Sequence, residues 1–329
     1  MKSLSITNLI NRSPLRSGVF LIALALIIVL TMGAPTANGA PGDLIAPQLS
    51  ISQNPGGDIF QLPINPSFGT PSFYWDNANL PGHYWAGIAF DQSGNLYASD
   101  VSSGEIYKLP PDRSTLILFA SGLNAPAGLA VDAAGNLYEA DTGSGNIYKF
   151  TPQGVLSTFA SGLNLIQGTG AYGNDNTIVF DSHGNLFVAS NYNDTYPSTG
   201  SIYKISPQGA VITFADLPDG YLGGAIGFDS AGNLFILTGN GYVYNYRLLK
   251  YTPDGTEFTV FGGGDLYYDC GISGTGLVID NADNIYIGTV PDYINKYLSR
   301  TRAGIRFRAY TSGVASLMRF LDNSSFSQR

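Results

Sequence analysis

The chain has 329 residues, of which 41 are glycine, 21 are tyrosine and only 12% are charged, and its formal net charge is −8. This composition favours many short strands joined by tight turns, and it argues against a disordered chain or a coiled coil. An acidic chain also lacks the clustered Lys and Arg that phosphate backbones require, so we expect no nucleic-acid partner.

The first part of the chain has the three parts of a secretory signal peptide. Basic residues precede an apolar run over 19–32, which is short for a membrane-spanning helix, and Ala37 and Gly39 fit the small residues before a cleavage point. We predict a signal peptide over 1–39 and a single domain over 40–329. The mature chain would be exported, periplasmic or extracellular, with no membrane span. The alternative is an uncleaved N-terminal membrane anchor.

A short signature, Asp followed three residues later by Gly-Asn, recurs through the rest of the chain. Its aspartates are Asp91, Asp132, Asp181, Asp229 and Asp280, and the fifth copy has Asp283 in place of the glycine. A period of about 40–50 residues with four strands per unit is typical of a β-propeller. Each signature Asp ends a first strand, and its side chain is expected to accept hydrogen bonds from the amides of a tight turn. We therefore assign these aspartates a structural role.

The five copies leave one blade to be completed by the two ends of the chain. Residues 49–63 align with residues 96–110, which places strands two and three of a blade near the N-terminus. The fold predicted is an all-β, six-bladed β-propeller whose sixth blade is closed by N-terminal strands (about 48–75) and a C-terminal strand (about 318–322). A closed ring leaves no open sheet edge, so we expect a monomer.

The segment "GLAVDAAGNLYEAD…GNIYKFTPQG" resembles NHL-repeat six-bladed propellers, which are relatives of the gluconolactonase-like superfamily. The resemblance covers about residues 49–322. It implies the architecture but no particular function, because one fold hosts many activities.

The connections opposite the signature turns are long and varied, and such loops commonly carry function. They hold aromatic side chains interleaved with short acids, which combine apolar area with directional hydrogen bonds. We predict a ligand-binding face there for a carbohydrate, a peptide or a cationic ligand. Its predicted residues are Trp75, Asp76, Trp85, Tyr172, Asp175, Tyr192, Tyr196, Tyr221, Tyr242, Tyr244, Tyr267 and Asp269.

Glu139 breaks the pattern of the repeat, because the same strand position is apolar in the other full copies. Its counterparts are Ala98, Val188, Ile236 and Ile287. A carboxyl group at such a buried position must be paired, hydrogen-bonded or neutral. We favour a structural Glu bonded to a neighbouring blade, and the functional alternative is that Glu139 is a catalytic acid or base, or a metal ligand, near the channel.

The resemblance to gluconolactonase-like propellers also implies a divalent ion held in the channel by Glu, Asn and Asp. None of the corresponding strand starts here carries a Glu, and only Asp175 and Asn176 reach such a position. They are the candidate ligands of a calcium ion, and no other cofactor is expected.

The leading prediction for function is a noncatalytic binding module. The alternative is a calcium-assisted lactonase or hydrolase that uses Asp175 and Glu139. The chain has two histidines: His183 falls in a signature turn and His83 stands alone in a loop, so a Ser-His-Asp arrangement is not expected. The single cysteine, Cys270, excludes an internal disulfide framework.

Overall fold

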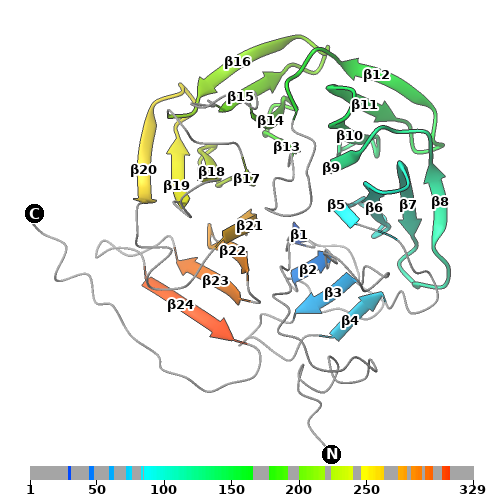
Figure 1. The fold of residues 1–329 in the computed structure, drawn as a ribbon, viewed down its shortest axis with the longest axis horizontal. Coiled ribbons are helices and arrows are strands. Elements are labelled where there is room, and N and C mark those ends of the chain that lie inside the picture. The colour runs from blue at the N-terminus through cyan, green and yellow to red at the C-terminus, as the bar shows by residue number, and fades with distance from the viewer. Residues whose placement is uncertain are drawn as a thin grey trace, which may run out of the picture.

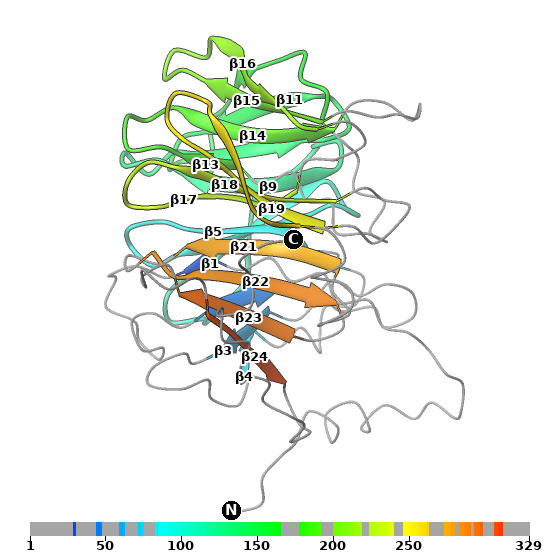
Figure 2. The same ribbon diagram turned by 90° about the vertical axis from the view of Figure 1, so that its left-hand side faces the viewer.

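The computed structural model describes residues 29–30, 44–47, 59–62, 72–75, 83, 85–165, 178–191, 200–218, 224–239, 246–262, 273–279, 283–290, 293–298 and 306–311. Within these segments the strands pair into six four-stranded antiparallel sheets. Figure 1 shows the sheets arranged around a centre, and Figure 2 shows that the strands run across the thickness of the disc. The chain is therefore an all-β propeller, and its strand ends form two opposite faces.

The first sheet contains β1 (Val29–Leu30), β2 (Leu44–Pro47), β3 (Ile59–Leu62) and β4 (Ser72–Trp75). The second contains β5 (Trp85–Phe90), β6 (Leu96–Asp100), β7 (Glu105–Leu109) and β8 (Ile117–Ala120). The third contains β9 (Pro126–Val131), β10 (Leu137–Asp141), β11 (Asn146–Phe150) and β12 (Leu156–Ala160).

The fourth sheet contains β13 (Ile178–Phe180), β14 (Leu186–Asn191), β15 (Gly200–Ile205) and β16 (Val211–Asp216). The fifth contains β17 (Ile226–Phe228), β18 (Leu234–Gly239), β19 (Tyr246–Tyr251) and β20 (Glu257–Gly262). The sixth contains β21 (Ser273–Ile279), β22 (Ile285–Val290), β23 (Tyr293–Leu298) and β24 (Arg306–Thr311).

Burial decreases from the inner to the outer strand of a sheet. All five residues of β6 are buried, because both faces of this strand pack against neighbouring sheets. The outer strand β8 is partly exposed, and Leu118 keeps about half of its surface, 51%, in solvent. Apolar clusters fill the seams between sheets. In one of them, Tyr97 and Phe119 pack edge to face with each other in a cluster that includes residues of β9–β11. The core is thus divided among these seams.

The signature aspartates have the predicted structural role in the four copies that the structure describes. Asp91 Oδ1 accepts bonds of 2.9 Å from the amides of Ser93 and Asn95, and its Oδ2 accepts one of 2.7 Å from Asn95 Nδ2. Gly94 has a φ of 80°, which glycine adopts without strain. Asp132, Asp181 and Asp229 repeat this network.

The fifth copy replaces the turn glycine by an aspartate. Asp283 adopts a φ of 60°, in the left-handed region that the turn requires. Its two carboxylate oxygens accept bonds of 2.7 Å from the amide and the hydroxyl of Ser230, on the preceding sheet. This substitution therefore ties two neighbouring sheets together on the turn side of the disc.

The first sheet differs from the predicted closure. Its innermost strand is β1, which lies inside the predicted signal peptide and pairs with β2, so all four strands come from the N-terminal part of the chain. The second strand of this sheet is β2. The alignment of 49–63 with 96–110 predicted it within 49–53, because that alignment requires a short connection between strands two and three. Residues 318–322 lie outside the described residues. Where the structure describes the chain, it contains no helix that is apolar and long enough to cross a membrane.

Candidate functional site

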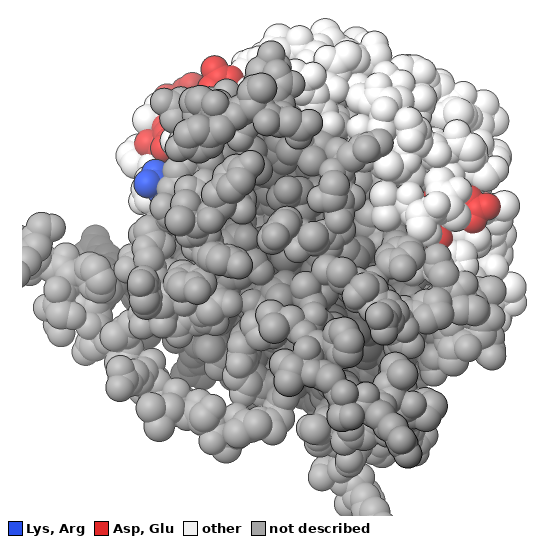
Figure 3. All heavy atoms as spheres, viewed as in Figure 1, with Lys and Arg blue, Asp and Glu red and all other residues white. Residues whose placement is uncertain are grey.

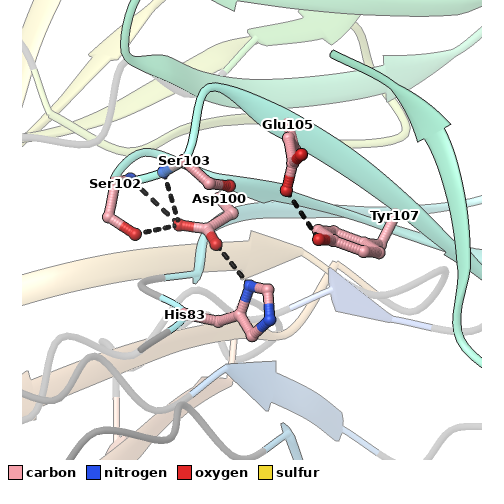
Figure 4. A network of polar contacts seen from close by, with 6 residues as sticks. All are labelled: His83, Asp100, Ser102, Ser103, Glu105 and Tyr107. Carbon is pink, nitrogen blue, oxygen red and sulfur yellow. Dashed lines mark hydrogen bonds and ion pairs between the residues drawn. The ribbon is translucent and has the colours of Figure 1, made fainter. Parts of the chain in front are cut away.

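A histidine and a buried carboxylate meet where β5 begins and β6 ends. The Nδ1 atom of His83 lies 2.5 Å from Oδ2 of Asp100 (Figure 4). Asp100 is completely buried, whereas the His83 side chain retains 14% of its exposed surface. These strand ends are opposite the signature turn of the same hairpin, so the pair lies on the face that was predicted to bind ligands.

The position of Asp100 is determined by the loop that follows β6. Its Oδ1 atom accepts a bond of 2.9 Å from the amide of Ser102 and one of 2.6 Å from the Ser102 hydroxyl. The amide of Ser103 lies 3.4 Å from the same oxygen (Figure 4). Because these donors hold Oδ1, the second oxygen points to the imidazole. Hydrogen bonds to an ionised carboxylate favour its charged form.

Aromatic side chains fix the plane of the imidazole. The His83 ring stacks on the indole of Trp85, with centroids 5.1 Å apart and planes 3° apart, and it meets the edge of Tyr107 at 5.1 Å. Tyr107 donates a bond of 2.6 Å to Glu105 Oε2. Burial raises the pKa of the Tyr107 phenol, and the bond to Glu105 raises it further. Tyr107 is therefore neutral, and it packs rather than titrates at neutral pH.

The next sheet contains the same arrangement without a histidine. Asp141 corresponds to Asp100 in the repeat, and its Oδ1 accepts a bond of 2.9 Å from the amide of Ser144. Its Oδ2 accepts a bond of 2.7 Å from the backbone amide of Asn124, the residue that corresponds to His83. A main-chain amide therefore does in this sheet what an imidazole does in the preceding one.

The second unusual group is Glu139, which is completely buried as its apolar counterparts predicted. It lies on β10 opposite Leu129 and Tyr148, in the seam between the second and third sheets. Its Oε1 atom accepts a bond of 3.3 Å from the amide of Ala127. Its Oε2 atom is buried and has no hydrogen-bond partner among the described residues.

The environment of Glu139 favours the protonated form. Burial raises its pKa well above the usual value and the nearby Asp141 carboxylate adds to this effect, while the Ala127 amide acts in the opposite direction. The carbonyl oxygen of the same residue, Ala127, accepts a bond of 2.6 Å from Ser99 Oγ on β6. Glu139 thus lies beside a polar link between two sheets.

The repeat shows why a glutamate fits here. In the second sheet, Ala98 occupies the Glu139 position and packs in one cluster with Trp85, which pairs with Asp100. In the third sheet, Pro126 pairs with Asp141 at the corresponding place. Where β10 carries the long Glu139 side chain, the inner strand begins with Pro126. Where β6 carries the short Ala98 side chain, the inner strand begins with the larger Trp85.

Among the described atoms on the face drawn in Figure 3, few belong to charged residues. The described Asp, Glu, Lys and Arg side chains lie near its rim, and the rest of the described surface there is uncharged. In the part of the chain that the structure describes, no three His, Cys, Asp or Glu residues form a group that could hold a metal ion.

Most of the predicted ligand face and the predicted metal ligands lie outside the described residues. These are Asp76, Tyr172, Asp175, Asn176, Tyr192, Tyr196, Tyr221, Tyr242, Tyr244, Tyr267 and Asp269, together with Cys270. Trp75 ends β4 and its side chain is not described. Trp85 is described, and it is fully buried beneath His83, so it supports the imidazole and does not reach a ligand itself.

Sequence reasoning missed the pairing of His83 with Asp100. His83 was treated as an isolated loop residue, although the spacing of 17 residues between His83 and Asp100 recurs between Asn124 and Asp141. Comparing the copies at the end of strand two would have identified it. His183 was placed correctly: its side chain is 82% exposed in the signature turn, on the opposite face.

Comparisons with known proteins identify the fold but no family. No family model and no curated protein sequence matches the chain. Similar solved structures include virginiamycin B lyase from Staphylococcus aureus, with a TM-score of 0.59, 13% identity and coverage of 89% of this chain and 85% of that one. A gluconolactonase from Xanthomonas campestris has a TM-score of 0.53, 14% identity and coverage of 88% and 91%.

A third similar structure is regucalcin from Agrobacterium tumefaciens, described as a calcium-binding protein. It has a TM-score of 0.50, 17% identity and coverage of 65% of this chain and 70% of that one. The neighbours are thus gluconolactonase-like and streptogramin-lyase-like propellers, and at these identities they show a shared fold alone. The NHL resemblance stays a prediction.

Proposed function

We propose that this chain is an exported β-propeller that binds a ligand through the face opposite its signature turns. The observation that supports this is the unequal construction of the two faces. Four described turns on one face repeat a single Asp-centred network, whereas the other face differs from sheet to sheet, as His83 and Asn124 show. Variable connections on a rigid frame are where propellers and similar scaffolds commonly bind ligands.

The ligand class that best fits this face is a carbohydrate, with a peptide or a cationic ligand as the alternatives. The predicted tyrosines offer planar apolar surface and hydroxyl groups, and His83 adds a partly exposed imidazole side chain. Binding would be the role of the monomeric protein in the periplasm or outside the cell, and it requires no chemical step.

Binding to arrays of soluble oligosaccharides and peptides tests this proposal. Tyr242→Ala and Tyr244→Ala should weaken the binding of any captured ligand at least tenfold, because each removes a stacking surface. His183→Ala, on the opposite face, is the matched control and should bind like the wild type. Loss of binding in the control alone, or capture of no ligand, would contradict the proposal.

A calcium-assisted hydrolase is the second candidate, and buried Glu139 is the observation that favours it. Its Oε2, which has no hydrogen-bond partner among the described residues, would become a hard oxygen donor of the kind calcium prefers once the carboxyl group loses its proton. The described residues supply this one carboxylate, and Asp175 and Asn176 would have to complete the site. A rise in the melting temperature with calcium that Asp175→Ala abolishes, together with turnover on a lactone panel, would support this candidate. No shift with any divalent ion would contradict it.

We also propose that export completes a six-bladed ring in the way the repeat predicts. Cleavage after residue 39 would remove β1, and residues 318–322 would then pair with β2 as the inner strand of the first sheet. Deleting residues 318–329 should then lower the melting temperature of the processed protein by several degrees and leave the unprocessed protein unchanged. Equal effects on both forms, or an N-terminus that retains residues 1–39 after export, would overturn this idea.

A further inference from the structure

We infer that His83 and Asp100 form a general-base pair that hydrolyses an acyclic carboxylic ester at this face. This goes beyond binding, because a binding surface needs no proton acceptor. The inference concerns the second sheet alone and uses neither Glu139 nor a metal ion.

The fold does not need the imidazole of His83 to satisfy the buried carboxylate. In the third sheet the corresponding Asp141 is satisfied by the backbone amide of Asn124 at 2.7 Å. Both carboxylates are completely buried and both are held by amides of the loop that follows strand two. A histidine in place of that amide adds a group that the structural task does not require.

The contact with Asp100 orients the imidazole ring of His83. Because a buried carboxylate faces Nδ1 at 2.5 Å, we assign the proton of the neutral imidazole to Nδ1. Nε2 then carries the lone pair, and Figure 4 shows this nitrogen on the side of the ring away from Asp100. The ring keeps a partly exposed edge, 14% of the side chain. This is the arrangement in which a carboxylate orients a catalytic histidine.

Asp100 and Trp85 both contact the His83 ring on which the proton would be held during the reaction. When Nε2 accepts a proton, the imidazolium is paired with the Asp100 carboxylate and lies parallel to the Trp85 indole at 5.1 Å. The carboxylate and the indole face thus both contact the ring where positive charge develops during the reaction. The stacked indole and the edge of Tyr107 also hold the ring in one plane, so little reorganisation is needed during reaction.

The reaction follows from one proton acceptor and water. Nε2 takes a proton from a water molecule while the water oxygen forms a bond to the ester carbonyl carbon, and the carbonyl π electrons move to its oxygen. When this tetrahedral intermediate collapses, the bond to the alkoxy oxygen breaks and that oxygen takes the proton from Nε2. The products are a carboxylic acid and an alcohol, and His83 is returned to its starting state.

Hydrolysis of p-nitrophenyl acetate by the full chain tests the inference. His83→Gln should lower kcat/KM at least 100-fold, and Asp100→Asn should lower it about 10²–10⁴-fold, because the asparagine amide no longer selects the Nδ1–H tautomer. His183→Gln is the matched control and should stay within twofold of the wild type. An unchanged rate in His83→Gln, or no turnover by the wild type, would overturn the inference.

Asp100 acts as a positioning residue, so its test needs a readout besides the rate. Asp100→Asn should lower kcat while KM stays within about twofold of the wild type, because the ring keeps its place but no longer presents Nε2 as the proton acceptor. A change confined to KM would exclude the pair as the functional unit.

Chemical modification of the wild type keeps the inference testable if a variant fails to fold. Diethyl pyrocarbonate acylates the unprotonated ring nitrogen of histidine, and the two histidines of the chain can be followed by mass spectrometry. Loss of esterase activity should follow the modification of His83, whose side chain is 14% exposed, and not that of His183, whose side chain is 82% exposed. Loss of activity with His183 alone modified would overturn the inference.

Discussion

The backbone amide of Asn124 donates a hydrogen bond of 2.7 Å to Asp141, at the place where the preceding sheet presents the imidazole of His83 to Asp100. Two copies of one repeat thus use the same carboxylate for two purposes. In the third sheet it closes a loop, and in the second it orients a side chain that can accept a proton.

The loop-closing role predicts a stability effect without a functional one. Asp141→Ala removes the acceptor of the Asn124 and Ser144 amides, which would be left without this partner in a partly buried loop. We expect the free energy of unfolding to fall by about 2–4 kcal/mol, from two lost bonds to a charged group. Urea denaturation measures this change.

The control for Asp141→Ala is Asp112→Ala. Asp112 is fully exposed and caps the amide of Ser114, so its removal should leave the urea midpoint unchanged. Ester hydrolysis should be the same in folded Asp141→Ala as in the wild type. Equal midpoints for the two variants would show that the buried loop closure does not stabilise the fold.

Buried Glu139 predicts a stability that falls as pH rises. Its pKa in the folded protein is well above the ordinary value of 4.5, so the unfolded chain loses this proton first as the pH increases. The folded state then binds more protons than the unfolded state, and the free energy of unfolding decreases from about pH 4.5 up to the raised pKa.

Glu139→Gln should remove this dependence, because glutamine keeps the shape and does not ionise. At pH 8 the variant should be more stable than the wild type, and the difference in the free energy of unfolding should shrink as the pH falls toward 4. Urea denaturation at several pH values provides the measurement. Parallel pH profiles would mean that the Glu139 carboxyl titrates normally in the folded protein.

The contact between the second and third sheets predicts a strong effect at one glycine. A Cβ atom on Gly87 would lie 2.1 Å from the backbone oxygen of Ala127, which cannot move without separating β5 from β9. Gly87→Ala should therefore lower the free energy of unfolding by about 3 kcal/mol or more. Gly122→Ala is the comparison, since Gly122 has a positive φ but no atom within 4 Å of the added Cβ.

That comparison separates a steric clash from backbone strain. Gly122→Ala should cost only about 1–2 kcal/mol, the strain of an alanine in the left-handed region. Thermal denaturation of both variants distinguishes the two effects. Equal losses would indicate that the sheets can shift to accept a methyl group at Gly87.

The link between the fourth-copy and fifth-copy turns predicts that Asp283 differs from an ordinary turn glycine. Asp283→Ala keeps a residue with a side chain at φ 60° and removes both bonds to Ser230. Asp283→Gly removes the same bonds but relieves the backbone strain. The glycine variant should melt above the alanine variant by several degrees, and the reverse order would exclude strain at this turn.

The sequence by itself determined the repeating unit of the fold. The Asp-x-x-Gly-Asn signature acts within a few residues, so its turn network and the paired strands on either side could be predicted from local chemistry. The burial of Glu139 followed from its apolar counterparts in the same way. Its neutral form required knowing that Asp141 lies nearby and that Oε2 lacks a partner in the described residues.

Tertiary structure decided which residues meet between distant parts of the repeat. The pairing of His83 with Asp100 depends on β5 and β6, which bring a loop and a strand end together. The innermost strand of the first sheet is a two-residue pairing, which many short apolar segments could form. Local patterns specify turns and strands because those forces act between neighbours in the chain. A side-chain contact across 17 residues, or a strand added from either terminus, depends on three-dimensional packing that no local pattern encodes.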